Sequence, residues 1–408
     1  MSNREFDVLL WGATGFTGGL VAEYMFRNHV LAGQNVRFAL GGRNEAKLEE
    51  VKRGLGQWGD ASAIPIVVAD PTSASSMDAV AARARVVAST AGPFNAYGRE
   101  LVGACARAGT HYVDITGEVT FVRHAIDQLH DVATKSGARI VPCCGFDSIP
   151  SDLGVFLAHE TLVEKGSALR RAELVVVSMT GEMSGGTAAS AMQLMGESAH
   201  DPAVRALLED PHALDPRGAT PGPETHELYD ARFETSLGKW TAPFIMRSIN
   251  ARVVRRTNAL LGHPYGEDFR YDERVAVGRG IAGRVRATAA ALGMRAALPL
   301  LRVDGLRKIV EGRLPKPGQG PSRAKREAGS FVIKIFGVGK GSDRVEVTVR
   351  GQQDPGYGET AKMLSESALA LAEGKDLPAR AGVLTPASAM GDALIARLRS
   401  AGMTFDAG

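Results

Sequence analysis

The first eighteen residues constrain the fold of this chain more than any other stretch. Residues 6–11 (FDVLLW) form a short apolar run that is typical of a buried β-strand. The run leads into Gly12, Gly15 and Gly18, spaced G-x-x-G-x-x-G, and then into a helical pattern. Glycines let the backbone turn tightly, and the exposed N–H groups at the helix start attract phosphate. We therefore predict a dinucleotide-binding turn, although the same glycines would also suit a plain strand–turn–helix corner.

The end of the second predicted strand, residues 36–40, indicates which dinucleotide is bound. An NAD site usually has an acidic residue here, which binds the ribose 2′-hydroxyl. This chain instead has Gly41, Gly42 and Arg43. The glycines leave room, and the planar guanidinium of Arg43 suits a phosphate. These residues predict NADP(H) as the cofactor; the alternative is that Arg43 only caps a solvated loop. The predicted cofactor contacts in both turns are Gly12, Thr14, Gly15, Phe16, Thr17, Gly18 and Arg43.

Length and composition narrow the class of protein. A chain of 408 residues exceeds one ordinary core, which predicts two domains. Its 44% apolar and 23% charged residues are typical of soluble globular proteins, and its net charge of +3 is too small to imply nucleic-acid binding. No apolar run reaches the length of about eighteen residues that a membrane span needs, and the N-terminus has no secretory pattern.

The three cysteines are Cys105, Cys143 and Cys144. Because the count is odd and two are adjacent, they suggest neither a disulfide framework nor a metal site. A reducing, cytoplasmic location is therefore expected.

Strands and helices alternate regularly over residues 5–144, which predicts a doubly wound parallel sheet of the Rossmann type. Among the predicted helices are 16–28, 45–55 and 99–108, and a later helix is predicted over 357–373. Later in the chain, 329–337 and 344–351 alternate like paired antiparallel strands. The predicted fold is therefore α/β with a second, α+β domain. The predicted parts are an NADP-binding domain over 1–150, a substrate or partner domain over 151–374, and a segment 375–408 that packs back on the first domain.

Ligands of such sheets bind beyond the carboxyl ends of the strands, so the residues after each strand are candidates for the site. Asp70 follows the third strand and either binds the adenine edge or opens a turn before Pro71. Ala91, Gly92 and Pro93 follow the fourth strand. They predict a small-residue turn beside the nicotinamide half of the cofactor, unless they form a simple loop.

Asp114, Gly117 and Glu118 follow the fifth strand. The two acids either orient substrate or take part in proton transfer, unless their roles are local. In the local interpretation, Asp114 caps the turn and Glu118 favours the positive end of the next helix. The backbone N–H groups near Gly117 and Gly145 are candidates for stabilising a negatively charged oxygen.

The segment 143–152 (CCGFDSIPSD) follows the last strand, and we expect it to form a wall between cofactor and substrate. Cys144 resembles a nucleophile, but no histidine is near in sequence and hydride transfer needs none, so a buried, inert thiol is favoured. Tyr97, Asp147 and Ser148 are the candidate catalytic residues, which would supply a proton or hold an ordered water.

A basic segment spans residues 270–316, with eleven Lys or Arg and four acids. Within it, 281–301 is either a basic amphipathic helix that lies on a membrane or an acidic partner, or a helix with a solvated basic face.

Several motifs resemble the saccharopine dehydrogenase-like family, and most closely its bacterial branch of trans-acting enoyl reductases. The resemblance runs nearly end to end. Its motifs are GATGFTGG, LGGRN, STAGPF followed by Tyr97-Gly98, YVDITGE, CGFDSIPSD, SGGT, VRRTNALLGHPYG and GVLTPASAMGDAL.

The resemblance implies an NADPH-dependent enoyl reductase that serves polyketide synthases in lipid biosynthesis. Its expected partners are an acyl carrier protein or polyketide synthase. The possible peripheral membrane contact through 270–316 rests on the basic pattern of that segment and not on the resemblance. Two alternatives remain open: a reductase of an imine or ketone in an amino-acid-like compound, and a non-catalytic NADPH-binding regulatory protein.

Overall fold

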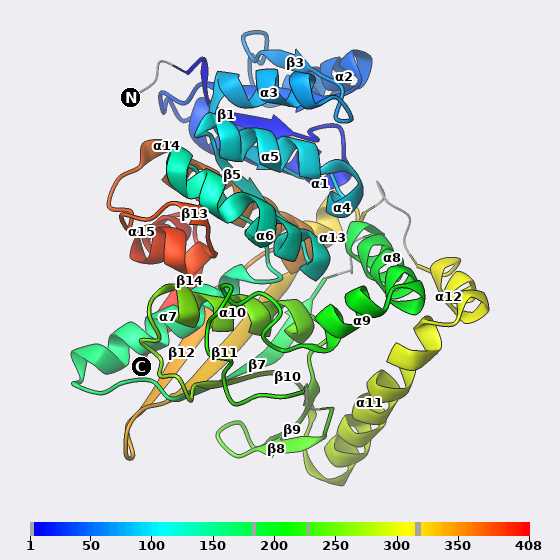
Figure 1. The fold of residues 1–408 in the computed structure, drawn as a ribbon, viewed down its shortest axis with the longest axis vertical. Helices are drawn as coiled ribbons and strands as arrows, with labels where there is room; N and C mark the ends of the chain where they lie inside the picture. The colour runs from blue at the N-terminus through cyan, green and yellow to red at the C-terminus, as the bar shows by residue number, and fades with distance from the viewer. Residues whose placement is uncertain (1–3, 182–184, 227–228, 315–319) are drawn as a thin grey trace. The chain divides into compact units, whose positions relative to one another are not determined.

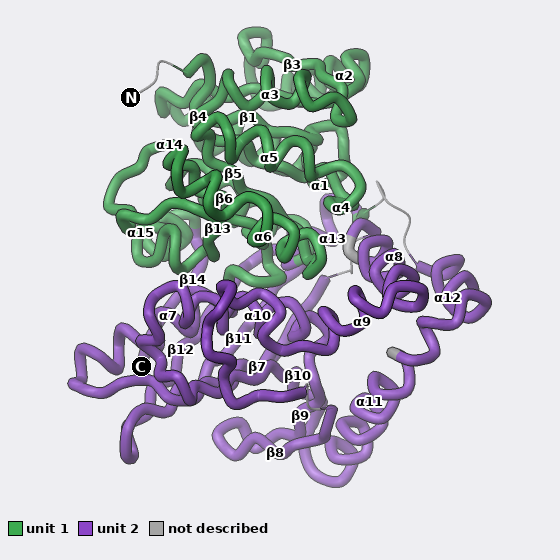
Figure 2. Tube along the Cα trace, in the orientation of Figure 1, with its two compact units in different colours: residues 1–149, 317–321, 356–401 green, residues 150–316, 322–355, 402–408 purple. Residues whose placement is uncertain are grey.

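The computed structural model of the protein describes residues 4–181, 185–226, 229–314 and 320–408. The chain forms two compact units, each built from segments far apart in sequence (Figure 2). Unit 1 comprises 1–149, 317–321 and 356–401, and unit 2 comprises 150–316, 322–355 and 402–408.

Unit 1 contains a seven-stranded sheet in the order β13-β6-β5-β4-β1-β2-β3, and every neighbouring pair is parallel. This confirms the predicted doubly wound sheet. Its strands are β1 (Phe6–Trp11), β2 (Phe38–Gly42), β3 (Ile66–Val68), β4 (Ala84–Ser89), β5 (His111–Asp114), β6 (Arg139–Val141) and β13 (Gly382–Val383).

The helices of unit 1 pack in two rows. One row contains α3, α5 and α6, and the other contains α2, α1, α14 and α15. Their bounds are α1 (Phe16–Met25), η1 (Phe26–Val30), α2 (Glu45–Leu55), α3 (Ala74–Arg83), α4 (Phe94–Tyr97), α5 (Arg99–Ala108), α6 (Val119–Ser136), η2 (Pro355–Glu359), α14 (Thr360–Glu373) and α15 (Pro386–Ser400); η1 and η2 are π-helical turns.

Unit 2 contains a second seven-stranded sheet, in the order β14-β12-β11-β7-β10-β9-β8. Only β7 and β10 pair in parallel; the other neighbours are antiparallel. The predicted antiparallel pair is present as β11 and β12. The strands are β7 (Arg171–Thr180), β8 (Arg232–Glu234), β9 (Lys239–Pro243), β10 (Arg270–Gly278), β11 (Ser330–Val338), β12 (Arg344–Gly351) and β14 (Thr404–Ala407).

The helix α7 packs closely on this sheet through a glycine. A Cβ atom on Gly154 would lie 2.6 Å from Cδ1 of the buried Ile335 on β11, so the close approach requires glycine. The helices of unit 2 are α7 (Ile149–Glu164), α8 (Gly185–His200), α9 (Pro202–Glu209), α10 (Arg247–Leu260), α11 (Gly280–Leu301), α12 (Asp304–Glu311) and α13 (Arg323–Glu327). None of the helices in the described part of the chain combines the length and apolar character that a membrane crossing requires.

The arginines of α10 are buried and hold the loop before residue 215. Arg252 donates to the carbonyl oxygens of Leu208 and Asp210, at 2.8 and 2.9 Å. Arg256 donates to the carbonyl oxygen of Leu214 at 2.6 Å. These guanidiniums therefore tie α10 to backbone oxygens at the end of α9 and in the loop that follows it.

The C-terminal third departs from the predicted domain boundaries. The helix α14, predicted to lie in the second domain, belongs to unit 1, where it contacts β1, β4 and β5. Residues 402–408, predicted to pack on the first domain, belong to unit 2, because β14 is the edge strand of its sheet and pairs with β12 from Val347 to Arg350. The sequence pattern of a helix or strand predicts that the element forms, but not which of the two sheets it will pack on or pair with.

Candidate cofactor-binding site

The glycine-rich turn after β1 has the tight geometry that its sequence predicts. Gly12 has a φ of +87°, and a Cβ atom there would lie 2.9 Å from the backbone nitrogen of Ala91. A Cβ atom on Gly18 would lie 2.1 Å from the carbonyl oxygen of Gly12. Any side chain at Gly12 or Gly18 would therefore displace the turn. At Gly15 the nearest such contact is 3.4 Å, an ordinary van der Waals distance, so packing within the turn does not exclude a Cβ atom there.

The helix α1 begins directly at this turn. Its N-cap residue, Gly15, has no capping side chain, and the first turn carries no acid. The positive end of the helix therefore faces the turn without a built-in counter-charge, which suits an anion. Thr14 is exposed, Thr17 is half-buried, and the ring of Phe16 packs edge-on against Tyr357 at a centroid distance of 4.8 Å.

The end of β2 places Arg43 in solvent. Among the described residues, the Arg43 side chain makes no hydrogen bond or ion pair, and Asn44 caps α2 by accepting from the backbone N–H of Lys47 at 3.0 Å. The sequence did not indicate why residue 41 is a glycine. A Cβ atom there would lie 2.8 Å from the side chain of Leu9 and 2.9 Å from that of Trp11. Arg43 is thus available to a phosphate, whereas Gly41 serves packing.

Asp70 follows β3 and forms a local turn. Its Oδ1 accepts from the backbone N–H of Thr72 at 2.9 Å and from the Thr72 hydroxyl at 2.8 Å. The backbone bond from Thr72 is the main cause of the lowered pKa of Asp70. Asp70 therefore forms the predicted turn through Oδ1. Its second carboxylate oxygen, Oδ2, remains a candidate for binding the adenine edge.

Glu118 holds the loop Ala91-Gly92-Pro93 in place through the two residues that follow it. The two carboxylate oxygens of Glu118 accept from the backbone N–H groups of Phe94 and Asn95, at 2.9 and 2.8 Å. Glu118 is only 3% exposed. It therefore positions the loop after β4 and caps the short helix α4, a role that neither of the two predicted alternatives included.

Asp114 joins the ends of β5 and β6. Its Oδ1 accepts from the backbone N–H groups of Thr116 and Cys143, at 3.0 and 3.1 Å. Cys143 has a φ of +64°, a left-handed conformation that costs energy in a residue with a side chain. Burial raises the pKa of Asp114 to about 7. The Cys144 thiol is buried and donates to the carbonyl oxygen of Val141 at 3.3 Å, as an inert thiol would.

The segment after Cys144 carries two of the candidate catalytic residues. Gly145 accepts at its carbonyl oxygen from the backbone N–H of Ser148 at 3.2 Å, which forms a turn. Ser148 is buried, whereas Asp147 is half-buried and its pKa is raised to about 6 by burial. Gly117 is half-buried in the turn after β5.

Tyr97 ends α4 and is 44% exposed. Within the described ranges, no hydrogen bond joins Tyr97 to Asp147. The structure therefore links the loops of the site with one another, but it does not link these two candidates for proton transfer.

Three contacts of the site were not recognised from the sequence. Thr90 donates to the carbonyl oxygen of Gly12 at 3.1 Å, which ties the end of β4 to the glycine turn. Thr360 accepts from the backbone N–H of Phe146 at 3.1 Å. Tyr357 contacts Phe16, as described above. Tyr357 and Thr360 are more than 200 positions away from their partners, so local sequence carried no signal for them.

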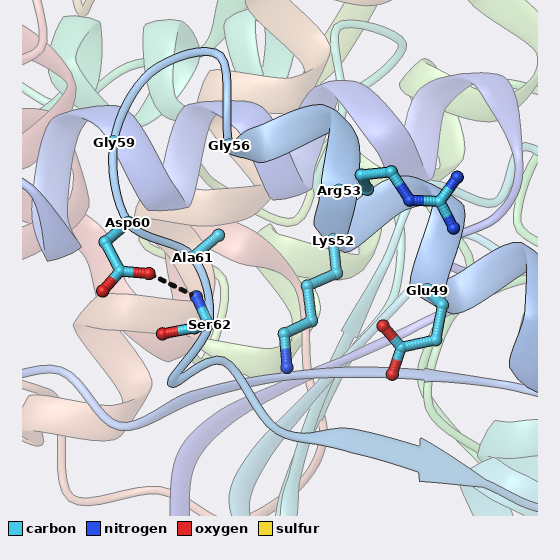
Figure 3. Close-up of a pocket in the computed structure, with 8 residues that line it drawn as sticks. All are labelled: Glu49, Lys52, Arg53, Gly56, Gly59, Asp60, Ala61 and Ser62. Carbon is cyan, nitrogen blue, oxygen red and sulfur yellow. Dashed lines mark hydrogen bonds between the residues drawn. The ribbon is translucent and has the colours of Figure 1, made fainter.

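A pocket in unit 1 lies away from this site (Figure 3). It lies between the last turns of α2, where Lys52 and Arg53 are found, and the loop in which Asp60 accepts from the backbone N–H of Ser62 at 2.8 Å. Arg43 precedes the opposite end of α2. This pocket contains none of the predicted cofactor residues.

A parallel doubly wound sheet with a glycine turn and an uncapped helix start at its carboxyl edge is typical of a dinucleotide-binding domain. Comparison with known proteins specifies the group. Residues 8–141 match the NADP-binding domain of saccharopine dehydrogenase. A trans-acting enoyl reductase of Mycobacterium tuberculosis (strain ATCC 25618 / H37Rv) is 41% identical over 416 residues, which cover 99% of this chain and 98% of the relative.

A second relative, the trans-acting enoyl reductase of Mycobacterium ulcerans (strain Agy99), is 38% identical over 418 residues, which cover 100% of this chain and 98% of the relative. Among solved structures, apo saccharopine dehydrogenase (L-Glu forming) from Saccharomyces cerevisiae superposes with a TM-score of 0.54 at 12% identity, covering 98% of this chain and 99% of that one. That likeness shows the fold alone. The chain belongs to the saccharopine dehydrogenase-like family, in the branch of the trans-acting enoyl reductases.

The protein is thus an NADP-dependent oxidoreductase, and the predicted cofactor is confirmed by the family. The residues present fit this cofactor. The turn at Gly12 and Gly18 excludes side chains, the start of α1 has no acid, and Arg43 has no partner among the described residues.

Proposed function

We propose that this protein is an NADPH-dependent reductase of the carbon–carbon double bond in an enoyl thioester, acting in trans for a polyketide synthase in lipid biosynthesis. The observation that carries this proposal is the identity of 41% with a trans-acting enoyl reductase across 99% of the chain. A likeness that covers the whole chain includes both units, and not only the NADP-binding domain.

In this proposal the first two strand ends bind the cofactor. The glycine turn and the start of α1 would hold the pyrophosphate, and Arg43 would pair with the 2′-phosphate. The loop Ala91-Gly92-Pro93 would contact the nicotinamide half, and Glu118 keeps that loop in place through Phe94 and Asn95. NADPH, when bound, supplies the hydride that reduces the β-carbon of the enoyl group.

The remaining residues would manage charge and protons on the substrate. Backbone N–H groups at Gly117 or Gly145 would stabilise the negative charge on the thioester oxygen. The α-carbon must then receive a proton, and Asp147 is the candidate whose chemistry suits this step best, because its pKa of about 6 keeps part of it protonated near neutral pH. Tyr97 and Ser148 are the other candidate donors.

The proposed substrate is presented by an acyl carrier protein or by the synthase itself. The support for this partner is the designation of the relatives as trans-acting reductases. A reductase that acts in trans must accept an acyl chain held by another protein.

The first experiment is NADPH oxidation by the purified protein with a long-chain 2-enoyl thioester, presented on coenzyme A and on a carrier protein, with NADH as the control. We expect turnover with NADPH and a product two mass units heavier, as reduction of one double bond requires. Tight NADPH binding without turnover on either carrier would reject the proposal, and turnover of an imine or ketone instead would reassign the substrate.

A pH profile tests the role of Asp147. If Asp147 donates the proton, the protonated form is the active one, so kcat falls as pH rises through about 6. Asp147→Asn should reduce kcat by about 100-fold or more and remove this dependence while NADPH binding remains. Tyr97→Phe and Ser148→Ala are the matched variants. An unchanged profile in Asp147→Asn, with turnover lost in one of the other two, would transfer the role to that residue.

A further inference from the structure

Large apolar side chains that face solvent are concentrated in one part of unit 2. The helices α11 and α12 (yellow-green to yellow in Figure 1), with the turn between them, span residues 280–311. Sixteen large apolar side chains of the described residues are exposed, and eight of these lie in this segment. They are Ile281, Val285, Leu292, Leu300, Val303, Leu306, Ile309 and Val310. A concentration of this kind marks an interaction surface.

The helix α11 packs on its own unit with small residues and leaves several of its large described side chains in solvent. Ala287 and Ala291 are buried, and α11 contacts β9, β10 and α8. Ile281, Val285 and Leu292 are 84%, 62% and 59% exposed. Their spacing of four and seven residues places them on one helical face, opposite the buried alanines. A helix whose only task was to cover unit 2 would have the reverse arrangement.

The helix α12 repeats this arrangement. Leu306, Ile309 and Val310 share one face and are exposed, whereas the side chain of Arg307 is only 13% exposed. Arg307 approaches Gly196 of α8, at 3.1 Å from the position of a Cβ atom there. The polar side of α12 therefore contacts the rest of unit 2, and its apolar side does not.

Positive charge accompanies the apolar stripe. From residue 279 to residue 313 the chain has eight basic and two acidic side chains, a net charge of +6, whereas the whole chain is +3. The remainder of the protein is therefore net negative. Among the described residues, Arg286, Arg295 and Lys308 make no ion pair, so their charge is available to an external partner.

We propose that the exposed face of α11 and α12 binds the surface of an anionic lipid bilayer, with the aliphatic side chains in the acyl boundary and the basic ones at the headgroup phosphates. A bilayer satisfies the apolar stripe and the excess charge together. A second copy of this chain would bring two surfaces of charge +6 face to face, which charge repulsion opposes. At about 1.5 Å per residue, α11 offers a contact roughly 33 Å long. This inference does not depend on the reaction proposed above.

Vesicle co-sedimentation of the full-length protein tests the proposal. Vesicles of phosphatidylcholine alone are compared with vesicles that also hold about 30 mol % phosphatidylglycerol, at low and high salt. We expect binding to the anionic vesicles, weakened by salt. The triple variant Ile281→Asn, Val285→Asn, Leu292→Asn should bind the anionic vesicles about tenfold more weakly or worse. The variant Arg286→Gln, Arg295→Gln, Lys308→Gln should lose the preference for anionic lipid.

A matched control replaces three exposed valines elsewhere, Val68, Val132 and Val163, by Asn. It should bind vesicles as the unchanged protein does. NADPH binding and the thermal melt of every variant establish that it is folded. No binding to anionic vesicles at low salt would overturn the proposal, as would equal binding by the triple variant. Binding of an acidic carrier protein through this face, without vesicle binding, would also overturn it.

A depth probe gives an independent result. The three native cysteines are buried, so a single exposed cysteine can be labelled with an environment-sensitive dye. The dye at Val285→Cys should shift its emission to the blue with anionic vesicles, whereas the dye at Val163→Cys should not. Identical behaviour at both positions would contradict insertion of this face.

Discussion

Arg43 is the residue whose surroundings distinguish NADP from NAD most directly. Two other arginines of unit 1 near strand ends have a carboxylate partner: Arg37 pairs with Asp7 at 2.8 Å, and Arg83 pairs with Glu5 at 2.7 Å. Arg43 is exposed and has no such partner among the described residues. Its charge is therefore not neutralised within the described chain, and a 2′-phosphate can use it.

Arg43→Ala should weaken NADPH binding by about 10- to 100-fold, because it removes a charge-assisted hydrogen bond to the phosphate. NADH, which lacks the 2′-phosphate, should bind almost as before. Fluorescence titration with both cofactors measures the two dissociation constants. Arg53→Ala, which removes an exposed arginine near the other end of α2, is the matched control and should change neither. Equal weakening of both cofactors by Arg43→Ala would refute the assigned role.

Asp114 predicts a pH dependence of stability. Burial raises its pKa to about 7 in the folded protein, from an ordinary value of about 3.9. The folded state therefore holds a proton that the unfolded state has lost between about pH 4 and 7. With more protons bound in the folded state, the free energy of unfolding falls as pH rises through this window.

Asp114→Asn retains an acceptor for the N–H groups of Thr116 and Cys143 but cannot ionise. The variant should therefore gain stability relative to the unchanged protein as pH rises from about 4 to 7, by up to about 4 kcal/mol for a shift of about three pKa units. Urea denaturation at a series of pH values measures this difference. A constant difference across that range would show that the carboxyl ionises normally.

These residues also show what local sequence can reveal. The roles of Gly12 and Gly18 were predictable because strand, turn and helix start are adjacent in the chain. Gly41 was assigned to cofactor space, but its neighbours Leu9 and Trp11 require glycine for packing across the sheet. Glu118 was predicted to act on substrate or to favour the start of the next helix, but it binds the backbone of Phe94 and Asn95. Local sequence did not indicate this role because both partners precede Glu118 by more than twenty residues.

At the scale of elements, the helix α14 is the unexpected part of unit 1. All residues from 360 to 372 are buried, and the helix contacts α1 as well as three central strands. Its Glu366 accepts from Tyr24 at 2.8 Å, pairs with His29 at 2.8 Å and accepts from Arg397 at 2.9 Å. One carboxylate thus joins α14 to α1, η1 and α15.

Glu366→Ala should destabilise unit 1 by about 3 to 5 kcal/mol, because it leaves buried donors without their acceptor. Burial lowers the pKa of His29, but its hydrogen bonds to the side-chain oxygens of Glu366 and Gln34 outweigh burial and raise that pKa. Burial raises the pKa of Glu366, but His29 and Arg397 outweigh it and lower that pKa. The contribution of His29 is lost as pH rises through its raised pKa, and that of Glu366 is lost as pH falls through its lowered pKa.

The loss in Glu366→Ala should therefore be largest between about pH 4.3 and 6.5, the ordinary values of the two groups. Denaturant titrations across this range measure it. Glu373→Ala is the control, because Glu373 is 52% exposed and its bond to Arg397 should contribute at most about 1 kcal/mol. A loss in Glu366→Ala no greater than that of the control would mean that this network does not hold α14 in place.

Elements with strong local signals were predicted well. The helices over 45–55 and 99–108 have the predicted bounds, since Asn44 caps the first and Gly109, at a φ of +69°, ends the second. The predicted helix over 16–28 changes into a π-helical turn at Phe26, for which the sequence had no marker. The pattern of 357–373 predicted a helix correctly but could not indicate its neighbours.

At the scale of the whole molecule, neither unit is a continuous segment. The glycine turn and the first six strands of unit 1 come from residues 1–149, but 356–401 supply α14, α15 and the edge strand β13. The contacts that join these pieces are extremely distant in sequence: Phe146 and Thr360 are 214 positions apart, and His29 and Glu366 are 337 apart. The change of pattern near residue 150 indicated a domain boundary there. The return of the C-terminal segment to unit 1 was predicted only in part, because α14 was not included in it.

The fragment 1–149 should therefore not form a stable NADP-binding domain. Without 356–401, strand β6 becomes an open edge, and the surfaces of β1, β4 and β5 that contact α14 are exposed. We expect this fragment to aggregate or to melt without cooperativity, and to bind NADPH at least about tenfold more weakly than the full chain. Circular dichroism melts and fluorescence titration measure both properties.

Joining 1–149 to 356–401 should restore the domain. A linker of about six Gly and Ser residues spans up to roughly 20 Å, and the backbone nitrogen of Phe146 lies only 3.1 Å from the Thr360 hydroxyl, so the two ends lie within reach of each other. The fused chain should melt cooperatively and bind NADPH about as tightly as the full protein. The same fusion with Glu366→Ala is the control, which should melt earlier because its docked helix is weakened. If 1–149 alone already melted cooperatively and bound NADPH with full affinity, α14, α15 and β13 would be additions to a complete domain and not parts of it.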